Sequence, residues 1–380
     1  MEFKKSLNSA PALIAAVTLL AIIVGIVGGL RGGNDTDRFT HENFANTRPS
    51  QVITADMPHG QIAIEHIRFM SDNLYNRFGF SYRELKAAEW IVEELLAMGY
   101  SWEDITVQEF TFNDIEFFPI YGVAVEYMAS MVPLYFFIDM SPFINLNIRR
   151  SRQSQNIILT IPGQSEQFII VGAHYDTMMF PGASDNASGT ALLLESAQRM
   201  RYIDNYYTII YVFFGAEEVG LVGAFYYANS LSDNDHENLL FMLNADVLLE
   251  GPDLFYMGGY NNFGRPGANH ITKIWDAIAY DISLRYGVPL RPKPDGIYGP
   301  SDHLVFLPWS HTVMFMIGLD LSGYGDGTNV DLNTLLANAR VLHSPRDEFH
   351  YINESWPGKM EQNMMIFSIF LEELLLADYY

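Results

Sequence analysis

The sequence predicts an α/β fold, a three-layer sandwich whose mixed, mostly parallel central sheet carries helices on both faces. Apolar strand-like runs alternate with helical patterns along most of the chain, and this alternation is typical of layered α/β folds. A hydrophobic fraction of 49% and a charged fraction of 18% over 380 residues describe a globular protein with a sizeable core. No internal repeat or low-complexity segment interrupts the pattern.

The predicted elements follow from the spacing of apolar residues. Continuous or alternating apolar runs predict strands at residues 105–112, 156–161, 168–172, 207–214, 239–246 and 312–317. Apolar residues three and four positions apart predict two helices within 61–99, and further helices at 187–200, 222–230, 268–286 and 358–377.

Charge and cysteine content exclude several classes of function. The formal net charge is −23 and no Lys/Arg cluster is visible, so we expect no nucleic-acid partner. Cysteine is absent, which excludes disulfides, Cys-type zinc sites and thiol catalysis. Any metal must therefore be held by histidines and carboxylates.

The N-terminus carries a candidate membrane segment. Residues 1–9 form a short tail with Lys4 and Lys5, and the uncharged residues 10–30 are long enough to cross the roughly 30 Å of a bilayer core. We predict a transmembrane signal anchor that leaves the folded domain outside the cytoplasm, on the periplasmic or extracellular side. A cleaved signal peptide, which would make the protein secreted, and a buried helix are the alternatives.

Residues 31–56 are polar and lack periodicity, so they are predicted to be a linker to a domain over 57–380. Within that domain, residues 117–147 are rich in Phe, Met, Tyr and Ile. A second membrane span there would separate the 61–112 elements from the sheet on which they should pack. We expect instead an apolar insertion that covers the active site or rests on the membrane surface, with a buried helical excursion as the equal alternative.

Potential metal ligands lie at the ends of the predicted strands. The apolar run 168–173 ends in His174, and Asp176, two residues later, can hold the second ring nitrogen of that histidine. Asp246 closes the 239–246 run, and His343 follows a short apolar pair. Each residue alone could be structural.

Two further segments carry carboxylates. Asp185 lies in a loop of small residues before a helix, where a metal ligand and a helix N-cap are equal interpretations. Glu217 and Glu218 follow the 207–214 strand, and because adjacent side chains point in different directions, one can bind metal while the other acts as a general base. A solvated acidic turn is the alternative.

Taken together, two histidines and several carboxylates at successive strand ends form a nitrogen and oxygen ligand set suited to zinc. If one acidic residue bridges two metal ions and each ion has two further ligands, the set forms a two-metal site. Such a site could polarise a carbonyl and activate water.

The combined pattern resembles the M28 family of co-catalytic zinc peptidases, from about Gln61 onward. The motifs that carry the resemblance occur in the family order, and they are Asn76-Arg-Phe with the helix to Glu94, His174-Tyr-Asp176, Ser184-Asp-Asn-Ala-Ser-Gly189, Glu217-Glu-Val-Gly220, Asn244-Ala-Asp246, Ser301-Asp-His303 and His343-Ser-Pro-Arg-Asp347.

The resemblance implies the zinc-exopeptidase fold, two Zn²⁺ ions and a role for each site residue. One zinc would be held by His174 and Asp246, the other by Glu218 and His343, and Asp185 would bridge them. Glu217 would be the general base, Asp176 would orient His174, and Asp302 would support the site. His303 is interpreted as structural.

Two further expectations come from the family. Tyr298 falls where some members place a tyrosine that binds the oxyanion, whereas Leu342 occupies the position that other members use for it. An unusual peptide bond before Asn186 is also expected. The insertion at 117–147 has no counterpart in the compact members.

The activity implied by the resemblance is removal of N-terminal residues from peptides or proteins, by a bridging water that two zinc ions and Glu217 activate. A single-zinc glutaminyl cyclase, a non-catalytic receptor-like relative and other peptidases are the alternatives. The cyclases lack the histidine that this chain has at His174. Apolar residues near the predicted site, namely Met178, Met179, Phe180 and Phe349, favour a bulky apolar residue at the cleaved position.

Overall fold

The computed structural model describes residues 57–112, 152–262, 265–267, 269–292, 301–321 and 341–380. The predicted anchor at 10–30, the linker at 31–56 and the insertion at 117–147 lie outside these residues, so they stay predictions. Within the described ranges, no helix combines the length and apolar character needed to cross a membrane.

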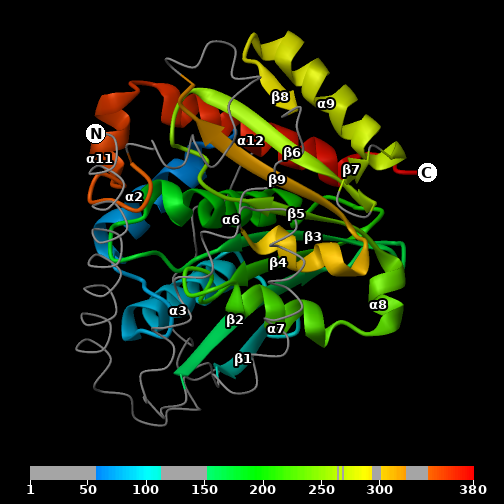
Figure 1. Cartoon of the computed structure of the whole chain (residues 1–380), viewed down its shortest axis with the longest axis horizontal. Helices are drawn as coiled ribbons and strands as arrows, with labels where there is room; N and C mark the ends of the chain where they lie inside the picture. Colours follow the sequence, from blue (N-terminus) through cyan, green and yellow to red (C-terminus); the bar gives the residue numbers. More distant parts are fainter. Residues whose placement is uncertain (1–56, 113–151, 263–264, 268, 293–300, 322–340) are drawn as a thin grey trace, which may run out of the picture.

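The described residues form a central nine-stranded mixed sheet, in the order β1-β2-β4-β3-β5-β9-β6-β7, with β8 paired to β6. Its strands are β1 (Ile105–Phe112), β2 (Arg152–Ile161), β3 (Phe168–His174), β4 (Thr208–Phe214), β5 (Leu239–Ala245), β6 (Asp253–Asn262), β7 (Arg265–Gly267), β8 (Leu290–Pro292) and β9 (Thr312–Leu319). The neighbours β4, β3, β5 and β9 are parallel, whereas the pairings of β1 with β2, β2 with β4, β9 with β6 and β6 with β7 are antiparallel (Figure 1). The predicted mixed sheet is confirmed, with the parallel pairings of β4, β3, β5 and β9 at its centre and a further parallel pairing, β6 with β8, away from it.

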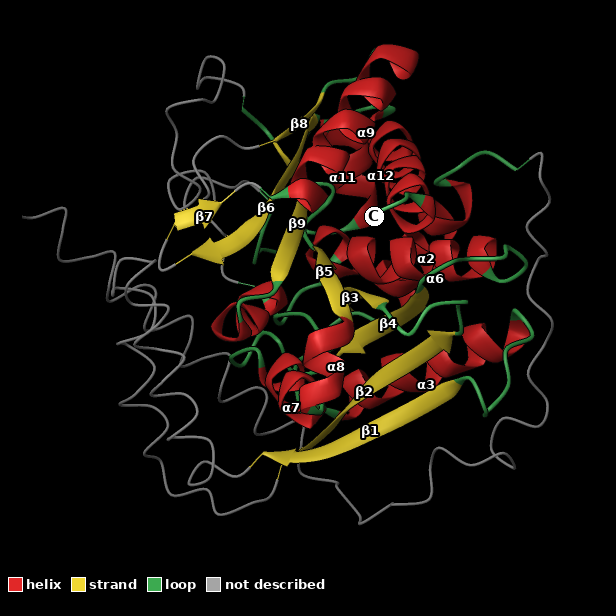
Figure 2. Ribbon diagram, turned by 90° about the vertical axis from the view of Figure 1, so that its right-hand side faces the viewer, coloured by secondary structure: helices red, strands yellow, loops and turns green. Residues whose placement is uncertain are grey.

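Helices cover both faces of the sheet, as Figure 2 shows. One layer contains α2 (Gln61–Asn73), α3 (Tyr82–Ala97), α6 (Ser188–Met200), α9 (His270–Tyr286) and α12 (Lys359–Leu376), and α11 (Phe349–Ser355) packs on α2 and α12. The opposite layer contains α7 (Val222–Ser230) and the 3-10 helix η2 (Asp302–Trp309), and α8 (Asp233–Asn238) follows α7. The predicted three-layer sandwich is confirmed.

The strands divide their apolar side chains between the two layers. In β3, Val171 packs into the core under α6, and Ile170 packs into the core under α7. In β4, Phe213 faces the α6 side and Phe214 the α7 side. This division follows from the two-residue period of a strand. Because both faces are covered, the central strands are almost entirely apolar, and this is why the sequence pattern predicts them.

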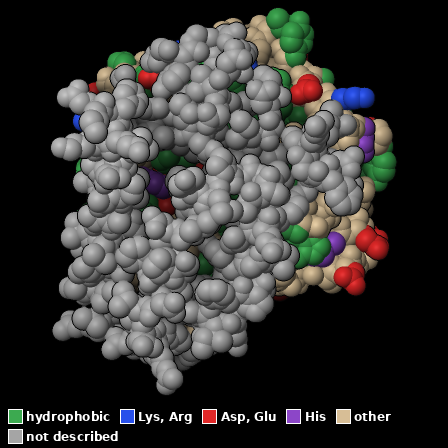
Figure 3. All heavy atoms as spheres, in the orientation of Figure 1, with side chains coloured by type: hydrophobic (Ala, Val, Ile, Leu, Met, Phe, Trp, Pro, Cys, Tyr) green, Lys and Arg blue, Asp and Glu red, His purple; other side chains and the backbone are tan. Residues whose placement is uncertain are grey.

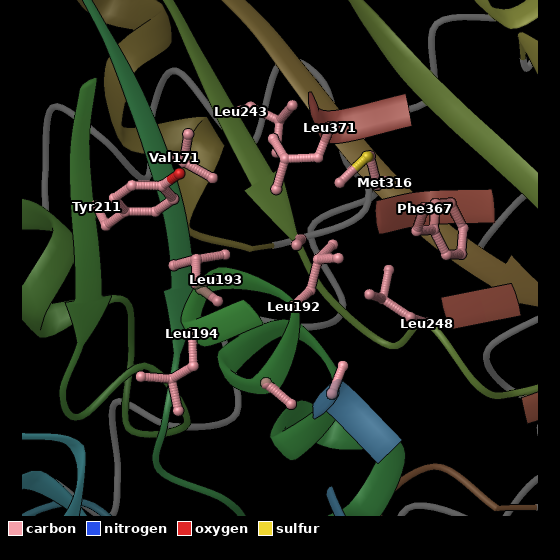
Figure 4. Close-up of a cluster of buried hydrophobic side chains, with 14 of the residues drawn as sticks. Val171, Leu192, Leu193, Leu194, Tyr211, Leu243, Leu248, Met316, Phe367 and Leu371 are labelled. Carbon is pink, nitrogen blue, oxygen red and sulfur yellow. The ribbon is translucent and has the colours of Figure 1, made fainter. Parts of the chain in front are cut away.

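Helix α6 is almost entirely buried. Its residues from Ser188 to Gln198 are all buried, between the sheet on one side and α2 and α12 on the other. Figure 4 shows this packing around Leu192, Leu193 and Leu194 of α6, Val171, Tyr211, Leu243 and Met316 of the sheet, and Leu248, Phe367 and Leu371. Interiors packed in this way move little, so α6 is a fixed base for the loop that precedes it.

The strand β6 is not predicted by the sequence. Gly258 and Gly259 within it are typical of a turn, yet here they lie in an extended strand beside β9. A Cβ atom at Gly258 would lie 2.6 Å from the carbonyl oxygen of Val313. The glycine therefore reflects a close approach of two backbones, which depends on the tertiary fold.

A buried carboxylate, Glu195, joins three helices of the larger layer. It accepts hydrogen bonds from the backbone N–H groups of Gly60 (2.7 Å) and Ala63 (2.9 Å) at the start of α2. It also accepts from the Ser368 hydroxyl (2.8 Å) of α12 and from Arg199 Nε (2.9 Å) of α6.

We expect Glu195→Ala to lower the free energy of unfolding by about 3 kcal/mol, because it leaves buried donors and one guanidinium without their acceptor. Glu372→Ala is the matched control. Glu372 pairs with His59 at 3.3 Å, and both side chains are 27% exposed, so its loss should cost at most about 1 kcal/mol. Urea unfolding of both variants measures the difference, and equal losses would show that Glu195 does not have this role.

Candidate metal centre

Within the described residues, two groups of three side chains could each hold a metal ion, and they share one residue. The first is His174, Asp185 and Asp246, and the second is Asp185, Glu218 and His343, with the ligand atoms of each group within 4.8 Å of one another. Asp185 Oδ1 lies 3.2 Å from His174 Nε2, and Asp185 Oδ2 lies 2.9 Å from His343 Nε2. The two oxygens of one carboxylate therefore face the two groups separately.

These residues meet because their strands are parallel neighbours. His174 is the last residue of β3, Asp246 follows β5 directly, and Glu218 follows the end of β4. The carboxyl ends of β4, β3 and β5 lie side by side in the sheet (Figure 1), which is the usual place for a ligand site in an open α/β sheet. Figure 3 shows histidine and acidic side chains next to each other on one face of the molecule.

Asp185 lies in η1 (Ala183–Ala187), an irregular turn directly before α6 in which the backbone of Asp185 is not helical (φ −115°, ψ 91°). The alternative interpretation of Asp185 as an N-cap is wrong, because the N-cap residue of α6 is Ala187. The peptide bond between Asp185 and Asn186 is cis, as the family resemblance led us to expect. The Asn186 side chain donates to the carbonyl of Ala245 (2.9 Å) and accepts from the N–H of Gly189 (2.8 Å), which fixes the turn.

Asp176 contacts His174 and also does more than the sequence indicated. His174 Nδ1 lies 3.2 Å from the backbone oxygen of Asp176 and 3.5 Å from its Oδ1. The Asp176 carboxylate accepts hydrogen bonds from the backbone N–H groups of Glu217 (3.0 Å) and Glu218 (3.2 Å). The same residue thus supports one potential ligand and fixes the turn that presents the two glutamates.

The remaining oxygens of the potential ligands are held by the protein. Asp246 Oδ1 lies 3.2 Å from His174 Nε2, and its Oδ2 accepts from the Ser301 hydroxyl (2.7 Å). Glu218 Oε2 lies 3.3 Å from His343 Nε2, and its Oε1 accepts from the N–H of Met178 (3.0 Å). Each carboxylate therefore directs one oxygen toward a histidine and has the other fixed.

Arg77 is a buried residue of the site that the sequence indicated only as part of a family motif. Its guanidinium donates to the carbonyls of Tyr175 (2.8 Å), Pro181 (2.9 Å) and Gly182 (3.1 Å). These carbonyls flank the loops that carry His174 and Asp185. Burial lowers the pKa of Arg77 to about 10, against the opposing effect of nearby carboxylates such as Asp347.

The electrostatics of the centre favour a cation. Burial raises the pKa of Glu217 well above its usual range; the charge of His174 opposes this rise, and the charges of Asp302, Glu218 and Asp246 add to it. Burial raises the pKa of Asp302 in the same way, and within the described part of the chain neither of its carboxylate oxygens has a hydrogen-bond partner. Buried carboxylates at this density need a compensating proton or metal ion.

The histidines respond to the same charges. Burial alone would lower the pKa of His174, but Asp246, Glu217 and the hydrogen-bonded carboxylates raise it well above the usual value. The carboxylates of Glu218 and Asp185 raise the pKa of His343 in the same manner, against the effect of its partial burial. In the metal-free protein these histidines therefore keep a proton that a metal ion would have to displace.

The donor set and its spacing fit zinc. Histidine nitrogens and carboxylate oxygens are ordinary zinc ligands, and two ligand atoms at about 2.1 Å from a tetrahedral ion lie about 3.4 Å apart. The four histidine–carboxylate distances are 3.2, 3.2, 2.9 and 3.3 Å. Both groups can therefore accept an ion with little movement.

Other residues named from the sequence have different outcomes. Tyr298 lies outside the described residues, so its role stays a prediction. His303 is fully buried and stacks on Phe315 at 4.7 Å between ring centroids, as expected of a structural histidine. The proposal that Phe349 lines the site is wrong, because its side chain is buried in the main core; Met178, Met179 and Phe180 are half-buried.

Comparison with known proteins identifies the family of the chain. Residues 156–368, more than half of the chain, match the profile of peptidase family M28. Aminopeptidase YwaD of Bacillus subtilis is 35% identical over 109 residues, which is 28% of this chain and 24% of that protein. The chain thus spans about a quarter of the length of this relative.

Solved structures share the fold. A zinc aminopeptidase from Bacillus subtilis superposes with a TM-score of 0.60 at 18% identity, over 85% of this chain and 97% of the other. A glutaminyl cyclase from an Acidobacteriales bacterium superposes with a TM-score of 0.56 at 19% identity, over 86% and 97% of the two chains. At these identities the likeness establishes the fold, which peptidases and cyclases have in common.

Metal removal should make the stability of the protein fall as the pH rises. The pKa values of His174, His343 and Glu217 are higher in the folded protein than in the unfolded chain, where they are about 6.5 for His and 4.3 for Glu. Protonation of each group therefore stabilises the folded state, and this stabilisation is complete below the pKa of the unfolded chain. It is lost as the pH rises through the higher folded values. We expect calorimetry of chelator-treated protein to give a Tm that decreases from about pH 6 to about pH 9. A Tm that rises over this range would contradict the assignment.

Proposed function

The chain belongs to peptidase family M28, and from that premise we propose that it is a zinc-dependent aminopeptidase. Its substrates would be peptides or proteins with a free N-terminus, from which it removes the first residue. The observation that carries the proposal is the pair of three-ligand groups that share Asp185.

We assign two zinc ions to these groups. His174 and Asp246 would hold one ion, Glu218 and His343 would hold the other, and Asp185 would bridge them. The separation of the two Asp185 oxygens, one toward each histidine, supports this division. When bound, two zinc ions would polarise the carbonyl of the scissile bond and lower the pKa of a water molecule between them.

Glu217 is the residue that we assign to proton transfer. It is adjacent to Glu218 but belongs to neither ligand group, and its charge interacts with His174, Asp246 and Asp302. A buried carboxylate with a raised pKa can take a proton from the attacking water and deliver it to the leaving amine. The Asp176 carboxylate fixes the backbone of Glu217, and this holds the base at one distance from the reacting atoms.

Tyr298 remains our candidate for the group that donates a hydrogen bond to the oxyanion. Its support is its position three residues before Ser301, whose hydroxyl binds Asp246. A Tyr298→Phe variant with unchanged kcat would remove this role.

A glutaminyl cyclase is the principal alternative, because cyclases share the fold. Against it stands His174, which completes the first ligand group and which we expect single-zinc cyclases to lack. A non-catalytic relative is disfavoured because all five potential ligands and Glu217 are present.

We propose in addition that residues 10–30 anchor the protein in a membrane, with the domain outside the cytoplasm, and that 117–147 covers the site or rests on the membrane. The uncharged and apolar composition of the two segments supports this. Recovery of the intact full-length chain in the soluble fraction after lysis would contradict the anchor.

The role of the insertion is tested by deletion of 117–147. If the deletion changes neither the length of the peptides that are cleaved nor the association with membranes, the proposed role is wrong.

We expect Glu217→Gln to keep both zinc ions and to lower kcat by a factor of about 10²–10⁴, because the change removes a proton-transfer group but no ligand. Steady-state kinetics together with zinc analysis of the same sample measure both quantities. His343→Ala is the contrasting variant and should lose zinc. If Glu217→Gln turns over peptides at a near-normal rate, another residue is the base.

A substrate panel separates the candidate functions. We expect rapid, chelator-sensitive cleavage of aminoacyl fluorogenic substrates and no cleavage of the same substrates with a blocked N-terminus. Pyroglutamate formation from N-terminal glutamine would support the cyclase instead. Efficient cleavage of blocked peptides would indicate a peptidase that does not require a free amine.

A further inference from the structure

A second buried carboxylate, Glu250, binds the backbone directly before His343. Its Oε1 accepts from the N–H of Val341 and its Oε2 from the N–H of Leu342, both at 3.0 Å. Only 3% of Glu250 is exposed. The two oxygens thus form a clamp on two successive peptide groups, and the next residue along the chain is a potential zinc ligand.

The segment that carries Glu250 is itself firmly held. Backbone N–H groups of Leu248 and Leu249 donate to the hydroxyls of Ser188 and Ser184, each at 3.1 Å. The Asn363 side chain of α12 donates to the carbonyl of Gly251 at 2.8 Å. Glu250 therefore extends from a fixed turn, and that turn is attached to the loop of Asp185 through Ser184.

His343 needs support of this kind more than the other potential ligands do. His174 ends a buried strand and Asp246 directly follows one, but His343 lies in a loop and its side chain is 44% exposed. Its backbone has a φ of 51°, a left-handed conformation that is unfavourable for a residue with a side chain. Packing around the imidazole therefore contributes little to its position, and the backbone must be fixed from elsewhere.

The same device recurs at two other loops of the centre. The Asp176 carboxylate binds the N–H groups of Glu217 and Glu218, as described above. The Asp347 carboxylate binds those of Ser184 (2.6 Å) and Asp185 (3.0 Å). Each clamp fixes the backbone at or just before a potential ligand, so Glu250 completes the set by fixing His343.

We propose that Glu250 is a positioning residue for His343, and that through it Glu250 sets the zinc affinity of the group formed by Asp185, Glu218 and His343. This inference rests on the proposed two-zinc function. Without the clamp, His343 would sample positions away from Asp185 and Glu218. The group of His174, Asp185 and Asp246 would keep its ion, because Asp185 stays held by the Asp347 carboxylate through hydrogen bonds that do not involve Glu250.

The test is Glu250→Gln in the full-length protein. The introduced side-chain amide would present an N–H group to one of the two backbone donors, so that only one of these two hydrogen bonds survives. We expect competition titration with a chelator to give one zinc of unchanged affinity and a second whose Kd rises about 10–100-fold, the usual cost of losing a support behind a ligand. Cobalt substitution should correspondingly give the absorption spectrum of a single occupied site.

Glu348→Gln is the matched control. Glu348 also binds two backbone N–H groups with its carboxylate, those of His350 (3.1 Å) and Tyr351 (2.5 Å), but it lies beyond His343 and caps α11. Its substitution should leave both zinc affinities unchanged. Glu250→Asp, which keeps the charge on a shorter side chain, should weaken the second zinc less than Glu250→Gln, and it serves as the test if the Gln variant does not fold.

Two results would overturn the role of Glu250: unchanged affinity for both ions, or an equal loss of both ions. Failure of the underlying function is recognised separately. In that case the unsubstituted protein would bind fewer than two zinc ions or would not cleave free-amine substrates, whatever the result for Glu250.

Discussion

The arrangement of the centre depends on one carboxylate whose two oxygens face two different histidines. Asp185 can do this only if its backbone is fixed in an unusual place, between the carboxyl ends of β3 and β5 and the start of α6. The Asn186 side chain, the Asp347 carboxylate and the enclosed helix α6 supply that fixation. Displacement of this single residue would disturb both ligand groups together.

The protein concentrates negative charge around Asp185 and compensates little of it. The buried guanidinium of Arg77 is directed to backbone carbonyls, so its donors are used to hold loops and not to pair with the carboxylates. Such a collection of charges is costly in a medium of low dielectric constant unless protons or metal ions balance it. The ligand side chains are already oriented in the folded protein. Each potential ligand has a hydrogen-bonding partner that fixes it, so the site needs little reorganisation when an ion binds.

The sequence predicted the parts of this structure that depend on local pattern. Apolar runs such as β3 and β4 are buried on both sides, and the polar residues that end them are conspicuous, so His174, Asp246 and the two glutamates could be assigned to one sheet edge. Contacts between distant segments leave no such pattern. The extended conformation at Gly258, the carbonyl contacts of Arg77 and the backbone clamps of Glu250 and Asp347 depend on tertiary packing, and nothing in the neighbouring residues marks them. Asp176 makes contacts of both kinds. Its contact with His174, two residues away, could be predicted from the sequence, whereas its hydrogen bonds to the Glu217 turn depend on tertiary packing.

The clamp of Asp347 on the Asp185 loop has a consequence for how such a chain can change in length. Asp347 lies four residues after His343, and both ends of this short stretch are tied to Asp185, one by its imidazole and the other by its carboxylate. An insertion or deletion of one residue between them would force one of the two contacts to break. Insertions and deletions should therefore be absent from this stretch in related chains. The number of residues between His343 and Asp347 is constrained by the two contacts, whereas other loops can vary in length.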